Sequence, residues 1–169
     1  KNLHEDTIKS LSESMVNLGL VPLGVDETIS MMHFFEFFMH GTGHWLGLDV
    51  HDAGSTEVDG QPRQFKDGMV TTVEPGIYVR PTKPVIEFPL IERDPKKIRE
   101  RRKLLGMEKA TILEKEEISN AKTIKHEIPK ELLGIGVRIE DDIICTNDGP
   151  VNMTEKAPKT IEEIEAITS

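Results

Sequence analysis

The 169-residue sequence predicts an α+β fold, because helical and strand patterns occupy separate stretches of the chain. Apolar residues recur at helical spacing from Ile8 to Leu18, and Gly19 is placed to end that helix. Residues 69–74 and 135–146 are instead rich in β-branched residues and stop at turn signals. The chain is therefore expected to combine helices with β-strands.

Local signals place the remaining elements. A second short helix is expected over about residues 26–33. Pro75-Gly76 stops the strand over 69–74, and the turn sequence at 147–150 follows the strand over 135–146. Thr160 and Glu163 match a capping box, which predicts a last amphipathic helix.

The segment at about 85–127 differs from the rest of the chain. It is rich in Lys, Arg and Glu and locally net positive, and residues 98–118 within it favour helix. We expect a solvated, charged insertion that lies outside the main core and carries no catalytic side chain. The strands on either side of it should pair as though it were absent.

The composition excludes several classes of protein. The formal net charge of -9 argues against a nucleic-acid partner, which would normally meet a basic face. No run approaches the roughly 18 apolar residues of a membrane-spanning helix, so no membrane partner is expected. The one cysteine, Cys145, excludes an internal disulfide and favours a reducing, cytoplasmic location. The chain begins at Lys1 inside a predicted helix, and we expect this start to be a cut.

The strongest chemical signal lies between residues 40 and 52, where His40, His44 and His51 occur with two aspartates and three glycines. Imidazole and carboxylate groups are the ligand mixture that divalent transition metals prefer. The glycines disfavour a helix, and a bend near Gly47 would bring His44 and His51 to one cleft. The alternative is that these histidines are ordinary surface or hydrogen-bonded side chains.

Glu74 ends a strand that is otherwise apolar or threonine-rich. Alternation places Val70, Thr72 and Glu74 on one face of that strand. A carboxylate in this setting is costly to bury unless it is paired or metal-bound. The alternative is a solvent-exposed glutamate at a strand end.

Arg138 and Glu140 are two residues apart in a predicted strand and therefore share a face. Ile135, Val137 and Ile139 are expected to form the opposite, core-facing row. Arg138 would orient Glu140 or bind a substrate carboxylate through its guanidinium group, and an ordinary salt bridge is the alternative. The two aspartates that follow Glu140 are expected to be turn or surface acids.

Taken in order, these motifs resemble those of the bacterial Xaa-Pro aminopeptidases (aminopeptidase P) of the pita-bread metallopeptidase family, which also contains prolidase. The matching stretches are residues 37–52, 68–78, 134–142 and 159–166. The resemblance implies that residues 1–169 are the carboxy-terminal part of a pita-bread domain, half of that fold, with a curved antiparallel sheet and flanking helices. The segment at about 85–127 has no counterpart in it.

The resemblance implies that His44, Glu74 and Glu140 are metal ligands, with Glu140 bridging two divalent ions. Mn²⁺ is the expected metal, with Co²⁺ or Zn²⁺ as alternatives. The family site uses five ligands, and two of them are aspartates well upstream of the histidine motif. Only Asp6 and Asp26 precede His44, in no matching context. We therefore expect this chain to lack both aspartates and to bind metal weakly.

The same resemblance implies the roles of the other site residues. Glu74 would also take a proton from the attacking water, while His40 and His51 would bind substrate and stabilise the tetrahedral intermediate. Arg138 would orient the metal site. The two metal ions would generate hydroxide at neutral pH and polarise the scissile carbonyl.

The hypothesis is thus a metal-dependent aminopeptidase that removes the residue preceding proline, with a peptide carrying proline at its second position as substrate. This chain would be an incomplete piece, inactive alone, and its partner would be the missing amino-terminal half of the same protein. The intact enzyme is expected to be a homo-oligomer. A prolidase acting on Xaa-Pro dipeptides and a non-catalytic pita-bread protein that binds peptides or partners are the alternatives.

Overall fold

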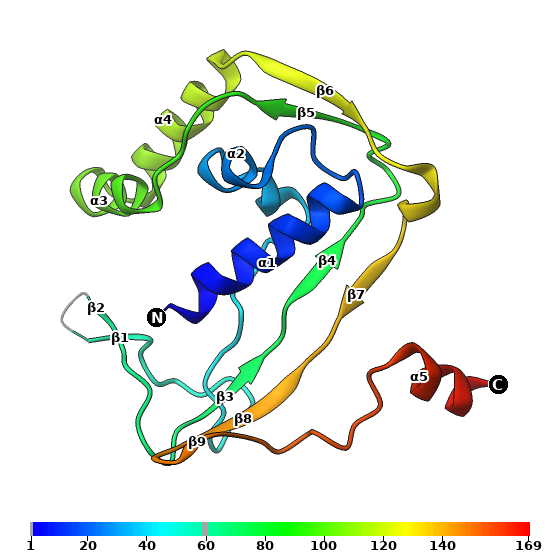
Figure 1. The fold of residues 1–169 in the computed structure, drawn as a ribbon. Coiled ribbons are helices and arrows are strands. Elements are labelled where there is room, and N and C mark those ends of the chain that lie inside the picture. Colours follow the sequence, from blue (N-terminus) through cyan, green and yellow to red (C-terminus); the bar gives the residue numbers. More distant parts are fainter. Residues whose placement is uncertain (1, 59–60) are drawn as a thin grey trace. The chain divides into compact units, whose positions relative to one another are not determined.

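The computed structural model describes residues 2–58 and 61–169, which divide into two compact units. Unit 1 contains the residues up to Met39 together with Ile77–Gly136, and unit 2 contains His40–Gly76 and Val137–Ser169. Each unit is therefore built from stretches that are far apart in the sequence. Both helices and antiparallel strands are present, which confirms the α+β prediction (Figure 1).

Unit 1 begins with two helices in the expected order. Helix α1 (Leu3–Asn17) is followed by Gly19 with a φ of 67°, a left-handed conformation that suits glycine at a helix end. Helix α2 (Val25–Ser30) ends earlier than predicted, because Met32 adopts a φ of 57° and the chain continues as the 3₁₀ helix η1 (His33–Glu36). The other elements of unit 1 are β5 (Val85–Pro89), α3 (Pro95–Leu105), α4 (Met107–Asn120), β6 (Thr123–Glu127) and η2 (Lys130–Leu132).

The core of unit 1 is aromatic. Phe34, Phe37 and Phe38 are buried with apolar side chains of α1 and of β5, including Ile86 and Phe88. The prediction that residues 85–127 lie outside the main core is therefore wrong at the ends of that segment. The physical reason is that β5 and β6 pair along their whole length, which holds the apolar face of β5 against the phenylalanines (Figure 1).

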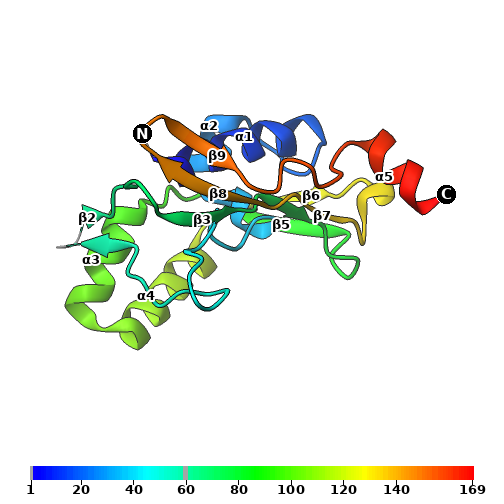
Figure 2. The same ribbon diagram turned by 90° about the horizontal axis from the view of Figure 1, so that it is seen from below.

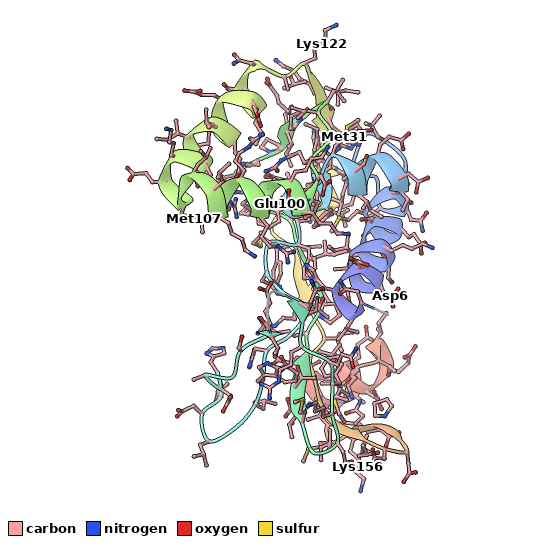
Figure 3. All side chains as sticks on the ribbon, turned by 90° about the vertical axis from the view of Figure 1, so that its left-hand side faces the viewer. Asp6, Met31, Glu100, Met107, Lys122 and Lys156 are labelled. Atoms are coloured by element: carbon pink, nitrogen blue, oxygen red, sulfur yellow. The ribbon has the colours of Figure 1, made fainter. Side chains whose placement is uncertain are left out.

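The middle of this segment forms a helical hairpin, as predicted for residues 98–118. Arg101 and Glu117 lie 2.7 Å apart, and Arg102 makes two contacts with Glu114, of 2.8 and 3.1 Å. Met107, at the turn between α3 and α4, is exposed (Figure 3). These charge pairs therefore link the two helices of the hairpin.

The strands that flank this segment pair with each other, as expected. Strand β4 (Gly76–Tyr78) pairs with β7 (Gly136–Arg138), and the chain passes between the two units within these strands. The predicted strand over 135–146 is broken after Arg138. Pro75 offers no N–H to a ladder at this point, which is a reason for the break.

Unit 2 is built around a three-stranded antiparallel sheet in the order β3-β8-β9 (Figure 2). The predicted turn follows β8 and is confined to residues 147–148, because Gly149 and Pro150 already belong to β9, a strand that the sequence analysis did not predict. Both hydrogen bonds of the capping box at Thr160 and Glu163 are present. The elements of this unit are β1 (Glu57–Val58), β2 (Gln61–Pro62), β3 (Val70–Val73), β8 (Asp141–Thr146), β9 (Gly149–Asn152) and α5 (Ile161–Thr168).

One predicted apolar row is not buried. Ile135, Val137 and Ile139 are 46%, 58% and 46% exposed, so the expectation that they face the core is wrong. The buried cluster is built on the phenylalanines and β5 and does not include them.

Among the described helices, none combines the length and the apolar character needed to cross a lipid bilayer.

Candidate metal centre

Residues 42–46 run beside β3, and this pairing brings the histidine motif next to Glu74. A Cβ atom on Gly43 would overlap the Thr72 carbonyl, so glycine allows the close approach of the two backbones. The backbone hydrogen bonds are Leu46 N–H to Val70 O (3.0 Å), Thr72 N–H to His44 O (2.9 Å) and Glu74 N–H to Thr42 O (2.7 Å).

The chain then turns back on itself, as the predicted bend near Gly47 requires. The Asp52 N–H donates to the Trp45 carbonyl over 3.1 Å, which closes a loop between these residues. The His51 ring consequently lies edge-on to His44, with ring centroids 4.4 Å apart. The structure thus brings His44 and His51 together.

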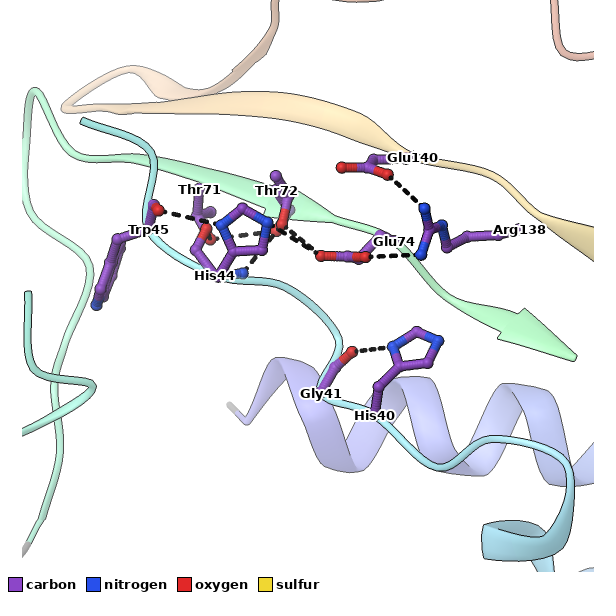
Figure 4. A network of polar contacts seen from close by, with 9 residues as sticks. All are labelled: His40, Gly41, His44, Trp45, Thr71, Thr72, Glu74, Arg138 and Glu140. Atoms are coloured by element: carbon purple, nitrogen blue, oxygen red, sulfur yellow. Dashed lines mark hydrogen bonds and ion pairs between the residues drawn. The ribbon is translucent and has the colours of Figure 1, made fainter. Parts of the chain in front are cut away.

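His44, Glu74 and Glu140 form the group of potential metal ligands in the described part of the chain. One ligand atom from each lies within 4.8 Å of the others (Figure 4). Glu74 is the most buried of the three, with 12% of its side chain exposed, while Glu140 is 38% exposed. The site is therefore anchored at Glu74 and open toward Glu140.

The His44 ring has the orientation of a metal ligand. Its Nδ1 lies 3.1 Å from the Trp45 carbonyl, and because a carbonyl oxygen only accepts, Nδ1 carries the proton of the neutral ring. The bare Nε2 then faces Glu74 Oε1 at 3.4 Å. Two such acceptors repel each other unless a cation or a proton lies between them, so this donor set fits a divalent cation.

Arg138 joins the two carboxylates. Its NH1 lies 3.5 Å from Glu74 Oε2 and its NH2 lies 3.5 Å from Glu140 Oε2 (Figure 4). The alternative in the sequence analysis was an ordinary salt bridge between Arg138 and Glu140. The structure shows that the same guanidinium also contacts Glu74. Its planar geometry suits such a bridge.

His40 lies outside the three-residue group. Its Nδ1 is 2.7 Å from the carbonyl oxygen of Gly41, at the start of the segment that pairs with β3 (Figure 4). The structure does not bring its ring into the group formed by His44, Glu74 and Glu140.

Two threonines of β3 contribute polar contacts that the sequence analysis did not assign. The Thr72 hydroxyl lies 3.0 Å from both the His44 N–H and Glu74 Oε1. The Thr71 hydroxyl donates to the His44 carbonyl over 2.9 Å. The strand alternation that puts Thr72 and Glu74 on one face was the available signal.

Asp141 serves the scaffold beside the site. It lies in β8 rather than in a turn, where its carboxylate accepts from the Thr154 hydroxyl (2.6 Å) and contacts Lys159 (2.9 Å). The Thr154 hydrogen bond, with help from Lys159, lowers the pKa of Asp141 below its usual value. These contacts hold the chain that follows β9 to the start of β8, directly after Glu140.

The sequence of this chain is similar to those of known proteins. The sequence profile of metallopeptidase family M24 matches residues 1–147. The chain is similar to the Xaa-Pro aminopeptidase of Escherichia coli K12, with 35% identity over 164 residues, which cover 96% of this chain and 27% of that protein.

Solved structures give the same result. The aminopeptidase PepP of Pseudomonas aeruginosa superposes with a TM-score of 0.67 and 35% identity, covering 97% of this chain and 28% of that one. Zinc-substituted E. coli aminopeptidase P in complex with product gives a TM-score of 0.65 and 34% identity over 98% of this chain and 28% of that one. The likeness confirms part of the pita-bread fold, and the chain spans little more than a quarter of these relatives.

Proposed function

The chain belongs to metallopeptidase family M24, and on this premise we propose that a longer protein containing it is an Xaa-Pro aminopeptidase. Such an enzyme removes the amino-terminal residue of a peptide whose second residue is proline. Relatives that match nearly the whole chain carry this name. The activity is proposed for the whole protein, to which this chain contributes part of the site.

The observation that carries the proposal is the convergence of His44, Glu74 and Glu140 within 4.8 Å. These three residues would hold a divalent cation, for which Mn²⁺ is our first choice and Co²⁺ or Zn²⁺ the alternatives. When bound, divalent ions of this kind polarise a scissile carbonyl and make hydroxide available near neutral pH. Two ions in the whole enzyme would need ligands beyond these three, because even one zinc-type site usually has four.

We assign the proton transfer to Glu74. Its Oε1 already accepts from the Thr72 hydroxyl, whereas Oε2 faces the half-exposed Arg138. In this proposal the Glu74 carboxylate takes a proton from the attacking water and returns it to the leaving amine. Arg138 lies between Glu74 Oε2 and Glu140 and would orient the two carboxylates.

His51 and His40 are assigned to substrate binding. The exposed His51 ring, stacked edge-on against His44, can donate a hydrogen bond to the oxygen on which negative charge develops. His40 would act from the beginning of the same loop. A cytoplasmic location and a homo-oligomeric state stay predictions.

The test uses the natural full-length protein with Mn²⁺ and three peptides: Ala-Pro-Ala, Ala-Ala-Ala and the dipeptide Ala-Pro. We expect cleavage of Ala-Pro-Ala alone, and a decrease in kcat of about 10²–10⁴-fold in Glu74→Ala. Circular dichroism of the variant serves as the folding control. Cleavage of Ala-Pro alone would point to a prolidase, and Mn²⁺ binding without cleavage of any peptide would refute the peptidase proposal.

A further inference from the structure

We propose that Thr72 is a positioning residue of the metal centre, which fixes the orientation of Glu74 and ties it to the segment that carries His44. The inference rests on the proposed function, in which Glu74 binds the metal ion and accepts a proton. Thr72 would not touch metal or substrate. It would act through the side chain two residues further along the strand.

The hydrogen bonds around the Thr72 hydroxyl have a fixed direction. The His44 N–H can only donate, so Thr72 Oγ1 accepts from it over 3.0 Å. The single hydroxyl proton is then available for Glu74 Oε1, also 3.0 Å away, and a carboxylate accepts it. The order is therefore His44 N–H to Thr72 O–H to Glu74.

The surroundings of Thr72 keep this arrangement in place. Its side chain is buried, with 2% of the residue exposed, and its backbone pairs with Asp142 of β8 on one side and with His44 on the other. A β-branched side chain in a strand has few allowed rotamers. Burial also leaves little room for a water molecule to replace the hydroxyl.

The consequence for Glu74 follows from its two oxygens. Thr72 holds Oε1, which is also the oxygen 3.4 Å from His44 Nε2. Arg138 attracts Oε2 from the opposite side. Without the hydroxyl, Arg138 would be the remaining attraction on the carboxylate and would turn it away from His44, which opens the metal site.

Thr71 provides a matched control in the same strand. It is also a buried threonine, but its hydroxyl is bonded to the backbone carbonyls of His44 (2.9 Å) and of Thr72 (3.1 Å). Thr71→Val therefore removes a buried hydroxyl of β3 without removing a contact to the Glu74 side chain.

The experiment compares Thr72→Val, Thr72→Ser and Thr71→Val in the natural full-length protein. We expect Thr72→Val to weaken Mn²⁺ binding by about 10–100-fold in titration calorimetry, and Thr72→Ser to retain the affinity within about threefold. Thr71→Val, which loses a contact to the His44 backbone, should lower the melting temperature and weaken Mn²⁺ binding much less than Thr72→Val does. Metal-free crystal structures should show the Glu74 carboxylate turned away from His44 in Thr72→Val alone.

An unchanged affinity and an unchanged Glu74 in Thr72→Val would overturn the inference. So would an equal loss of affinity in Thr71→Val, since general damage to β3 would then be the cause, or a Thr72→Ser protein as weak as Thr72→Val. If the parent protein neither binds Mn²⁺ nor cleaves peptides, the proposed function fails. The metal-free structures still decide whether Thr72 positions Glu74.

Discussion

Glu74 receives contacts from three residues: Thr72, on the same face of its own strand, and His44 and Arg138, which lie far away in the sequence. Thr72 and His44 meet one carboxylate oxygen and Arg138 meets the other. Arg138 is 47% exposed, and an ion pair at such a position contributes no more than about 1 kcal/mol to stability. Its value in this fold is therefore geometric, because it contacts two carboxylates at once.

His33 is a buried histidine in unit 1, with 3% exposed. Its Nε2–H donates to the Pro89 carbonyl over 2.9 Å, and its ring packs against Phe88 at 4.8 Å. Its Nδ1 has no hydrogen-bond partner among the described residues. Burial lowers the pKa of His33 below the usual 6.5, and the hydrogen bond to Pro89 offsets this only in part.

The pH dependence of stability follows from this lowered pKa. Below pH 6.5 the unfolded chain binds a proton at His33 more readily than the folded chain, so the free energy of unfolding should fall as the pH decreases from about 6.5 toward the folded-state pKa and should level off below it. His33→Gln keeps an N–H donor for Pro89 but does not titrate. Urea unfolding should therefore show that the free energy of unfolding decreases more between about pH 7.5 and about pH 5 for the parent chain than for the variant. Parallel pH profiles would contradict the assignment.

At the scale of elements, the sequence predicted those whose signals are local. Gly19 ends α1, and Thr160 with Glu163 opens α5, because capping and helix termination depend on residues a few positions apart. The end of α2 was missed, since the left-handed Met32 carries no recognisable signal. A β-branched or bulky residue at positive φ is unusual, and nothing in the residue type announces it.

Long-range pairing was harder to predict. Ile86 and Phe88 belong to a short alternating stretch within a highly charged segment, and their burial depends on pairing with residues 123–127 after two intervening helices. Such pairing leaves no pattern within a sequence window. The exposed row at Ile135, Val137 and Ile139 was wrong for the opposite reason, because alternation indicates a face but not what covers it.

The candidate site, too, was predicted only in part from the sequence. The resemblance to aminopeptidase P implied that His44, Glu74 and Glu140 are ligands of one metal centre, and the structure brings a ligand atom of each within 4.8 Å of the others. The role of Thr72 could not be predicted in full, because its hydroxyl reaches the His44 N–H only when residues 42–46 pair with β3. His40 remains a predicted site residue that lies outside the three-residue group.

We expect removal of the α3–α4 hairpin to leave β5 and β6 paired, although it also removes the hydrogen bond from the Arg93 N–H to the Ser30 carbonyl. The Leu90 N–H donates to the Lys122 carbonyl over 2.7 Å, so the two strands face each other at the point where the hairpin leaves them. Replacing residues 91–121 by Asn-Gly, which favours a two-residue turn, should keep the core intact. In the natural full-length protein, Mn²⁺ affinity and kcat should stay within about tenfold, or about 1.4 kcal/mol.

Removal of residues 85–127 is the matched comparison. It takes Ile86 and Phe88 from the core, and the loss of a large buried apolar side chain typically costs about 2–5 kcal/mol. The longer deletion should therefore unfold at much lower urea concentration than the shorter one. Equal stabilities would show that β5 and β6 do not belong to the core. Loss of turnover in a folded, metal-loaded variant lacking only 91–121 would show that the hairpin shapes the active site.

At the scale of the whole molecule, the number of metal donors limits what the chain can do. The described residues offer one group of three, His44, Glu74 and Glu140, and two of these are glutamates that repel each other without a cation. Arg138 offsets part of this repulsion but also competes with a metal ion for both carboxylates. The relatives that share the fold are more than three times as long, so they have room for further ligands.

We therefore expect the 169-residue chain alone to bind Mn²⁺ weakly and to show no cleavage of Ala-Pro-Ala above the buffer rate, even with excess Mn²⁺. The natural full-length protein, assayed in parallel, should cleave this peptide. The reason is that three protein donors can hold one ion, with water completing its coordination, but not the two ions proposed for the whole enzyme, and a weakly held ion is not positioned for catalysis. The chain carrying Glu74→Ala is the control for contaminating peptidases. If the chain cleaves Ala-Pro-Ala while its Glu74→Ala form does not, then His44, Glu74 and Glu140 suffice for catalysis, and the requirement for further ligands is wrong.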